Sequence, residues 1–380
     1  MAPLFSGKRR SLRDAPGLFE TLKDDVCRVS ADLKKRGWRR ELGASFSGLE
    51  AFYLTDADQA RLHEMTFISR WLHRLWWLVK GLLMKLTPAR RVLLAIALVQ
   101  IVSGDQRVQI GRTSFNFVGV GEVMLIVILM LELKDKLVAR QELEAGRVVQ
   151  LALMPERAPS VPGWDLWLYS EPANDVGGDL VDHMRIDGHR HGVALGDVAG
   201  KALPAALLMV KLQATLRALA PQFDTLGDLG SAVNRILQRD GLPNRFATLV
   251  YLVLTECSGE VRVLNGGHMP PVVVRAGALD RLPPGSMALG IMADATFTEQ
   301  RVELSEGDAL IVFSDGVSEA MNSSGDFFGD ERIGAVIHGS AGEPAAEIGG
   351  RLLQALAAFV GDARPYDDVS LMVLRRVNHA

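Results

Sequence analysis

The sequence has very little cysteine: Cys27 and Cys257 are the only two in 380 residues. Two cysteines this far apart form neither a disulfide framework nor a zinc site, which fits a reducing compartment. Histidine and cysteine are nowhere clustered, and no Ser-His-Asp or Cys-His signature is present. These absences argue against disulfide-rich domains, zinc enzymes and hydrolases with a nucleophilic side chain.

The sequence also lacks the marks of secretion and of nucleic-acid binding. Its first residues, MAPLFSGKRRSLRD, have no apolar core of the kind found in a secretory signal peptide. No basic patch interleaves with stacking aromatic residues downstream, so we expect no nucleic-acid partner.

Charge of one sign is unevenly distributed along the chain. The net charge is −3, but residues 1–91 hold 18 Lys+Arg against 10 Asp+Glu, and the remainder holds 24 against 35. A basic first part beside an apolar stretch suggests contact with an anionic membrane surface. The alternative is a solvated basic domain. Residues 1–66 show no chemistry of their own, and their role stays open.

Residues 67–133 are apolar in three blocks. Phe67–Leu86 mixes tryptophans with arginines and lysines, which suits a helix at a membrane interface. Val92–Val102 is short for a span, whereas Phe115–Leu133 is long enough to cross a ~30 Å hydrocarbon core. We expect a transmembrane hairpin with the outer loop SGDQRVQIGRTS and basic cytoplasmic flanks. The alternative is a buried hairpin in a soluble regulatory domain; Glu122 either faces a partner helix or argues against spanning.

A linker helix is predicted over residues 134–154, ending where PERAPSVPG breaks the pattern. Apolar residues approximate a heptad seam, but Arg140, Glu144 and Arg147 occupy its middle positions. A homodimer through this helix would therefore be only marginally preferred, which is what a switch requires. We expect the helix to control the orientation of the domain that follows it; the alternative is a passive tether.

From residue 155 onward, short β-like runs alternate with helices. Tight turns such as TECSGE point to antiparallel sheets with helices packed on them. The predicted strands are Asp165–Ser170, Val193–Asp197, Ala247–Leu254, Glu260–Asn265, Ala309–Phe313 and Val369–Leu374, and the predicted helices are Ala205–Leu219, Ser231–Arg239 and Ala345–Phe359.

Four turns in this region carry an aspartate: Asp179, Asp197, Asp315 and Asp367. The last three each adjoin an apolar strand, and the first follows two glycines. Any one such turn is usually structural. Several carboxylates that converge repel one another unless cations neutralise them, and Mg²⁺ and Mn²⁺ prefer such oxygen ligands. The combination therefore predicts a divalent-metal site.

Five segments in this region carry a family resemblance. They are EPANDVGGDLVD, ALGDVAGKALPAALLMV, LNGGHMPP, LIVFSDGVSEAMNSSGDFFGDERI and YDDVSLMVLRR. In this order and spacing they resemble the motifs of SpoIIE-like phosphatases, the bacterial branch of the metal-dependent protein phosphatase (PPM, protein phosphatase 2C-like) superfamily. The resemblance covers about residues 150–377. It implies an α+β fold, an α-β-β-α sandwich with a two-metal site between its sheets.

The resemblance also implies an activity and the residues that serve it. The activity is hydrolysis of phosphoserine or phosphothreonine on a regulatory protein, typically a small anti-sigma-factor antagonist used in partner switching. By position, Asp197 would bridge two Mn²⁺ or Mg²⁺ ions and the carbonyl of Val198 would bind one of them. Asp315 and Asp367 would hold the other ion, and Asp179 would support the cluster directly or through water.

The chain departs from the family pattern in two motifs. It has DLVD where the family often has DFYD, and GKA where it often has GKG, so that Ala202 replaces a glycine. No histidine follows Val198, so the group that protonates the leaving oxygen is not identified. Lys201 is a candidate phosphate contact or a solvated lysine, and His268 is a candidate general acid or a structural turn residue. Asp368 is expected to support the site rather than to bind metal.

The expected organisation follows from these observations. Residues 1–66 have an unknown role, 67–133 form the apolar helical region, 134–154 the linker helix, and 155–380 the phosphatase domain. We expect attachment to the cytoplasmic membrane with the phosphatase domain in the cytoplasm; the alternative is a cytoplasmic protein. Two other classes compete: a catalytically silent binding module of the same fold, which should have lost a carboxylate, and a membrane-helix sensor whose output is dimerisation.

Overall fold

The computed structural model describes residues 83–103, 107–110, 113–116, 119–240, 245–340, 342–363 and 365–378, with single helical positions between 69 and 80. The chain divides into two compact units, Met1–Lys134 and Asp135–Ala380. The helix α6 (Val120–Leu153) crosses this boundary. The predictions for residues 1–66, and most of that for the first apolar block, lie outside the described residues.

The first unit contains a helical hairpin. Helix α5 (Pro88–Ser103) packs against the first part of α6, and a β-hairpin of β1 (Arg107–Ile110) and β2 (Thr113–Asn116) lies between them in the chain. A Cβ atom at Gly121 would lie 2.9 Å from the carbonyl oxygen of Ala97, so glycine is what permits this close approach.

The third apolar block begins its helix later than the sequence predicted. Strand β2 takes up residues 113–116, and Gly119, at φ 101°, turns the chain into α6 at Val120. The prediction of one helix from Phe115 is wrong at this end, because local strand pairing competes with the helix. Glu122 lies exposed in the first turn of α6, where a negative charge suits the helix dipole.

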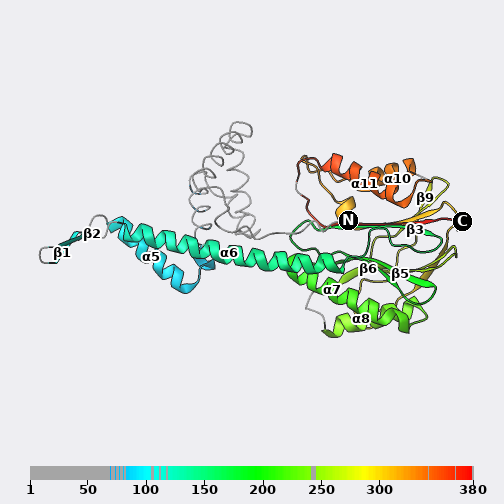
Figure 1. Cartoon of the computed structure of the whole chain (residues 1–380), viewed down its shortest axis with the longest axis horizontal. Coiled ribbons are helices and arrows are strands. Elements are labelled where there is room, and N and C mark those ends of the chain that lie inside the picture. Colours follow the sequence, from blue (N-terminus) through cyan, green and yellow to red (C-terminus); the bar gives the residue numbers. More distant parts are fainter. Residues whose placement is uncertain are drawn as a thin grey trace, which may run out of the picture. The chain divides into compact units, whose positions relative to one another are not determined.

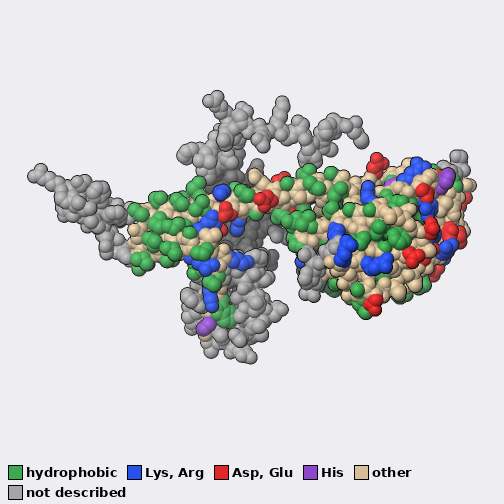
Figure 2. All heavy atoms as spheres, turned by 90° about the horizontal axis from the view of Figure 1, so that it is seen from below, with side chains coloured by type: hydrophobic (Ala, Val, Ile, Leu, Met, Phe, Trp, Pro, Cys, Tyr) green, Lys and Arg blue, Asp and Glu red, His purple; other side chains and the backbone are tan. Residues whose placement is uncertain are grey.

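The α5–α6 hairpin leaves much apolar surface uncovered. Figure 2 shows hydrophobic side chains gathered over it, and the exposed ones include Val99, Val102, Leu129 and Met130. Arg90 Nη1 lies 2.6 Å from Glu132 Oε1 between the two helices. Among the described residues, one helical stretch is long and apolar enough for a membrane span, Ala202–Gln222, and it packs on a sheet of the second unit.

The second unit is a sandwich of two five-stranded antiparallel sheets with helices on both outer faces (Figure 1). Helices α7 (Ala202–Leu219) and α8 (Leu226–Asp240) cover the first sheet, and α10 (Gly329–Gly339) and α11 (Ala345–Val360) cover the second. The first sheet has the order β10 (Glu299–Glu303), β7 (Glu260–Gly266), β6 (Ala247–Thr255), β5 (Arg190–Val198), β4 (Leu180–Arg185). The second has the order β3 (Trp164–Glu171), β12 (Val369–Arg376), β11 (Ala309–Phe313), β8 (Val272–Arg275), β9 (Ala278–Arg281).

Three apolar layers hold the sandwich together. Side chains alternate along each strand, so Val193 and Leu195 of β5 enter the layer between the sheets while Ala194 faces α7 and α8. Because both faces of the central strands are covered, these strands are almost continuously apolar rather than alternating. This is the α-β-β-α sandwich of the predicted α+β class, and the prediction is confirmed.

Candidate active site

The four predicted aspartates come from the ends of paired strands in both sheets. Asp179 directly precedes β4, and Asp197 lies at the end of β5, which pairs with β4. Asp315 follows β11 and starts the short helix α9 (Asp315–Ser318), and Asp367 lies just before β12, the partner of β11. The sandwich thus contributes two carboxylates from each sheet. We call these four residues the carboxylate centre.

The electrostatics show that the two pairs face each other. Burial raises the pKa of Asp197 to about 6, with further contributions from the negative charges of Asp315 and Asp367. Burial and Asp367 likewise raise the pKa of Asp315. The charges of Asp315 and Asp367 therefore destabilise the ionised form of a neighbouring carboxylate, as predicted for convergent acids without a cation.

Asp179 is the most deeply buried member of the centre. Its side chain is 4% exposed, and burial together with the charge of Asp197 raises its pKa well above the ordinary value. Its Oδ2 atom has no hydrogen-bond partner among the described residues. An unpartnered buried acceptor is costly, so this oxygen is a natural place for a cation or a cation-bound water.

Asp368 holds the glycine turn that carries Asp179. Its Oδ2 accepts a hydrogen bond of 2.6 Å from the amide of Gly178, and its Oδ1 accepts one of 2.8 Å from the amide of Ala173. A Cβ atom at Gly177 would lie 2.4 Å from Asp368 Oδ2, so the turn has no room for a side chain. The backbone thus uses both oxygens of Asp368, which agrees with a supporting role.

The loop after β5 brings the carbonyl of Val198 to the same turn. A Cβ atom at Gly178 would lie 3.1 Å from this carbonyl oxygen. The amide of Ala199 donates to the carbonyl of Phe246 at 2.9 Å, and Arg245 Nη1 donates to the carbonyl of Ala199 at 2.7 Å. Ala202 adopts φ 61°, a conformation that favours glycine, and here it stores strain.

Lys201 lies beside the centre rather than free in solvent. Its ammonium is 3.4 Å from Asp367 Oδ2, donates to the carbonyl of Tyr366 at 3.1 Å, and lies 3.9 Å from the centre of the Tyr366 ring. Lys201 also occupies the N-cap position of α7, where its side chain makes no capping hydrogen bond. A cation at a helix N-terminus next to the carboxylates is well placed to meet an anionic substrate.

His268 was interpreted from the sequence either as a general acid or as a structural turn residue, and its contacts are those of a structural residue. Its Nε2 donates to the carbonyl of Phe313 at 3.1 Å, so Nδ1 accepts from the hydroxyl of Thr248 at 2.8 Å. Burial lowers its pKa to about 4. A neutral ring with both nitrogens engaged supports the strands behind the site and has no free proton donor.

A match to a protein-family model shows the family of this chain. The model described as Stage II sporulation protein E (SpoIIE) matches residues 187–377, half of the chain. The chain belongs to the SpoIIE family. The predicted resemblance is therefore confirmed.

Two curated relatives are each 26% identical to this SpoIIE-family chain. One is Protein IcfG of Synechocystis sp., aligned over 73% of this chain and 48% of its own length. The other is the phosphoserine phosphatase RsbU of Bacillus subtilis, aligned over 62% of this chain and 70% of its own length. The chain thus spans about half the length of IcfG.

Solved structures show the same fold. The RsbU and RsbW domains of Rv1364c from Mycobacterium tuberculosis match with 26% identity and a TM-score of 0.51, over 60% of this chain and 65% of that one. The SiaA-PP2C domain of Pseudomonas aeruginosa matches with 16% identity and a TM-score of 0.55, over 63% and 98%. The second likeness shows the PP2C-like fold alone.

The sequence did not identify Gln150 as part of this SpoIIE-family site. Gln150 lies on α6 and is 4% exposed. Its amide nitrogen donates to the carbonyl of Gly177 at 2.8 Å, and its amide oxygen accepts from the Gly177 amide at 3.1 Å. Gln213 of α7 also donates to the carbonyl of Leu153, at 3.0 Å. The one feature of the sequence that could have pointed to Gln150 is that it is a lone glutamine in the apolar run VVQLAL.

Proposed function

We propose that this chain is a metal-dependent protein-serine/threonine phosphatase, a phosphoric monoester hydrolase. The observation that carries the proposal is the carboxylate centre, whose members come from two sheets and in which burial and neighbouring charge raise the pKa of Asp179, Asp197 and Asp315. The relative RsbU is named a phosphoserine phosphatase, which supports the same reaction class.

The residues present fit two Mn²⁺ or Mg²⁺ ions. The donor set is all oxygen, and Asp179 Oδ2 is buried without a partner among the described residues. In the described part of the chain, no three Asp, Glu, His or Cys side chains already surround one point as ligands. Mg²⁺ commonly binds through one or two carboxylates and keeps several waters, so a wet site is the expected form.

Each member of the centre has a proposed role. Asp197 would lie between the two ions, and the Val198 carbonyl would serve one of them. Asp315 and Asp367 would hold the other, with Asp179 acting directly or through water. Two bound ions at such a site lower the pKa of a shared water and neutralise phosphate charge.

The surrounding residues orient these groups and the substrate. Asp368 fixes the turn of Asp179 by accepting from the amides of Gly178 and Ala173. The Lys201 ammonium can move from Asp367 to a phosphate oxygen of the substrate. Its ion pair with Asp367 is 3.4 Å long and half-exposed, so it is weak. His268 keeps the strand ends in register and takes no proton.

The wider setting of the enzyme is also a proposal. The substrate would be a phosphorylated anti-sigma-factor antagonist, which is consistent with a structural relative that joins RsbU and RsbW domains. Residues 134–154 would be a linker helix able to form a homodimer, and 155–380 the phosphatase domain. The exposed apolar surface of the α5–α6 hairpin supports membrane attachment, with this domain in the cytoplasm.

The direct test uses the full-length chain with para-nitrophenyl phosphate and with a phosphoserine protein. Hydrolysis should require Mn²⁺ or Mg²⁺ and stop when a chelator is added. Turnover that persists in excess chelator would refute the metal-dependent assignment, and a folded chain without turnover in either metal would favour the silent binding module.

A further inference from the structure

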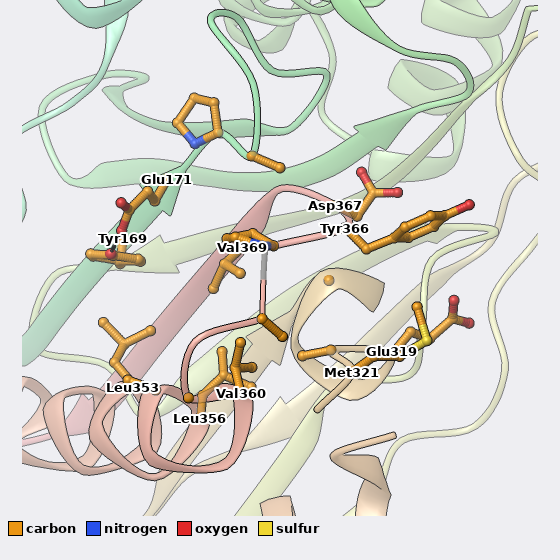
Figure 3. Close-up of a pocket in the computed structure, with 18 of the residues that line it drawn as sticks. Tyr169, Glu171, Glu319, Met321, Leu353, Leu356, Val360, Tyr366, Asp367 and Val369 are labelled. Atoms are coloured by element: carbon orange, nitrogen blue, oxygen red, sulfur yellow. Dashed lines mark hydrogen bonds between the residues drawn. The ribbon is translucent and has the colours of Figure 1, made fainter. Parts of the chain in front are cut away.

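An apolar cavity of about 560 Å³ opens directly beside the carboxylate centre (Figure 3). Asp367 and Gly316 line it, so it shares residues with the centre and with α9. Its other walls come from the last turns of α11 and from the ends of β3 and β12. The larger aliphatic side chains that line it are Met321, Leu353, Leu356, Val360 and Val369.

The charged groups of this cavity all have one sign. Glu171, Glu319 and Asp367 line it, and no lysine or arginine is among its described lining residues. Two cations lie against its aromatic lining residues: Lys201 lies over the Tyr366 ring and pairs with Asp367, and the Arg157 guanidinium lies 5.3 Å from the centre of the Tyr169 ring. An apolar interior with an acidic rim favours a ligand that combines an apolar side chain with a neighbouring positive charge.

The usual size of a protein interface indicates that the protein substrate itself covers this cavity. A stable interface covers roughly 800 Å² on each partner, which is a disc of about 16 Å radius. A protein that presents phosphoserine to the carboxylate centre must therefore also cover a cavity that begins at Asp367. At about 3.3 Å per extended residue, three residues on either side of the phosphoserine span about 10 Å, which lies within this disc.

We propose that this cavity receives an apolar side chain of the protein substrate, with a lysine or arginine beside it that pairs with Glu171 or Glu319. The inference rests on the proposed phosphatase activity and adds to it a specificity site. A buried apolar anchor next to the reacting group is how binding energy away from the reaction orients a substrate.

A matched pair of variants on α11 tests the cavity. Ala357 is exposed and lines it, whereas the next residue, Ala358, is also exposed and does not. Ala357→Trp should fill the cavity, and Ala358→Trp is the control for the same change on the same helix. Glu171→Gln tests the acidic rim and leaves the cavity open.

Three probes separate the cavity from the catalytic centre. They are para-nitrophenyl phosphate, a phosphoserine peptide with leucine and arginine within three residues on both sides, and the same peptide with alanine and glutamine instead. The wild type should prefer the first peptide roughly tenfold in kcat/KM. Ala357→Trp should lose this preference while its turnover of para-nitrophenyl phosphate stays unchanged. Glu171→Gln should lose only part of the preference, because the cavity stays open. Ala358→Trp should behave as wild type.

Several outcomes would overturn the inference. The first is that the wild type uses both peptides equally, and the second is that the two tryptophan variants behave alike. The third is that turnover of para-nitrophenyl phosphate increases in Ala357→Trp alone, which would place a segment of this chain in the cavity. Anisotropy of the fluorescein-labelled peptides measures the same preference as binding. This binding measurement tests the role of the cavity even if para-nitrophenyl phosphate is not hydrolysed. A lack of hydrolysis would contradict the proposed function and not the role of the cavity.

Discussion

Gln150 of α6 and Gly177 of the glycine turn form a pair of hydrogen bonds through one side-chain amide and one peptide unit, at 2.8 and 3.1 Å. The next two residues of that turn are Gly178, which donates to Asp368, and Asp179 of the carboxylate centre. A movement of this part of α6 therefore acts on the turn directly. The contact gives a physical basis for control of the site by the linker helix.

Removing this contact should change how the site binds metal. In Gln150→Ala, the buried amide and carbonyl of Gly177 lose their partners, at a cost of about 1–3 kcal/mol for each unsatisfied group. We expect the Mn²⁺ concentration for half-maximal activity to shift severalfold, measured with para-nitrophenyl phosphate. Gln141→Ala, an exposed glutamine on the same helix, is the control. Identical Mn²⁺ titrations for both variants would mean that the contact is only structural.

Substitutions at the seam of α6 test the switch itself. Arg140, Glu144 and Arg147 replaced together by leucine should favour one helix pairing, and a tenfold population shift needs only ~1.4 kcal/mol. Activity should then move strongly in one direction, with a matching change in oligomeric state by light scattering. A passive tether predicts unchanged turnover per folded enzyme, both for the leucine set and for a Gly/Ser linker in its place.

Asp197→Asn should have opposite effects on activity and stability. Turnover should fall to near zero, because one charge is proposed to serve both ions. The metal-free fold should gain roughly 1–3 kcal/mol at pH 8, because burial and neighbouring carboxylates raise the pKa of Asp197 to about 6, so its ionised form is destabilised there. Activity assays and urea unfolding in chelator measure the two effects. Near-wild-type turnover in a folded variant would refute the site.

His268 should make the fold sensitive to acid. Burial lowers its pKa to about 4 from an unfolded value near 6.5, so its contribution to stability is complete above about pH 6.5 and is lost as the pH falls towards 4. His268→Gln should flatten the fall in stability over this range by roughly 2–3 kcal/mol. Urea unfolding at several pH values measures it. His338→Gln, at an exposed position, is the matched comparison variant.

The α5–α6 hairpin should hold the full-length chain on membranes. Its exposed apolar side chains, such as Val102 and Leu129, are not released by salt, which screens only surface charge. After a high-salt wash of fractionated cells, the chain should remain in the membrane pellet. Recovery of monodisperse protein without detergent would instead favour a hairpin covered by protein.

The sequence by itself determined the fold of residues 155–380 and the positions of the four aspartates. Each of the six predicted strands is present, with ends that differ by a few residues. Strands such as β6 and β11 are continuous apolar runs buried on both faces, whereas β3 and β7 alternate between buried and partly exposed residues. The five motif segments placed the carboxylates in order along the chain. The spacing of the motifs in the sequence does not give the distances between the carboxylates. Strand ends on one edge of a packed sandwich nevertheless lie close together.

Only the tertiary structure decided the features that depend on distant partners. Strand β4 was missed because Asp182 and His183 interrupt its apolar pattern; Asp182 is nevertheless buried, since Arg217, 35 residues away, pairs with both of its oxygens at 2.6 and 2.8 Å. The pairing of Lys201 with Asp367, the apolar cavity and the Gln150 contact likewise join segments far apart in the chain. Periodicity and propensity describe neighbours in sequence, so contacts of this kind appear only when the chain is folded.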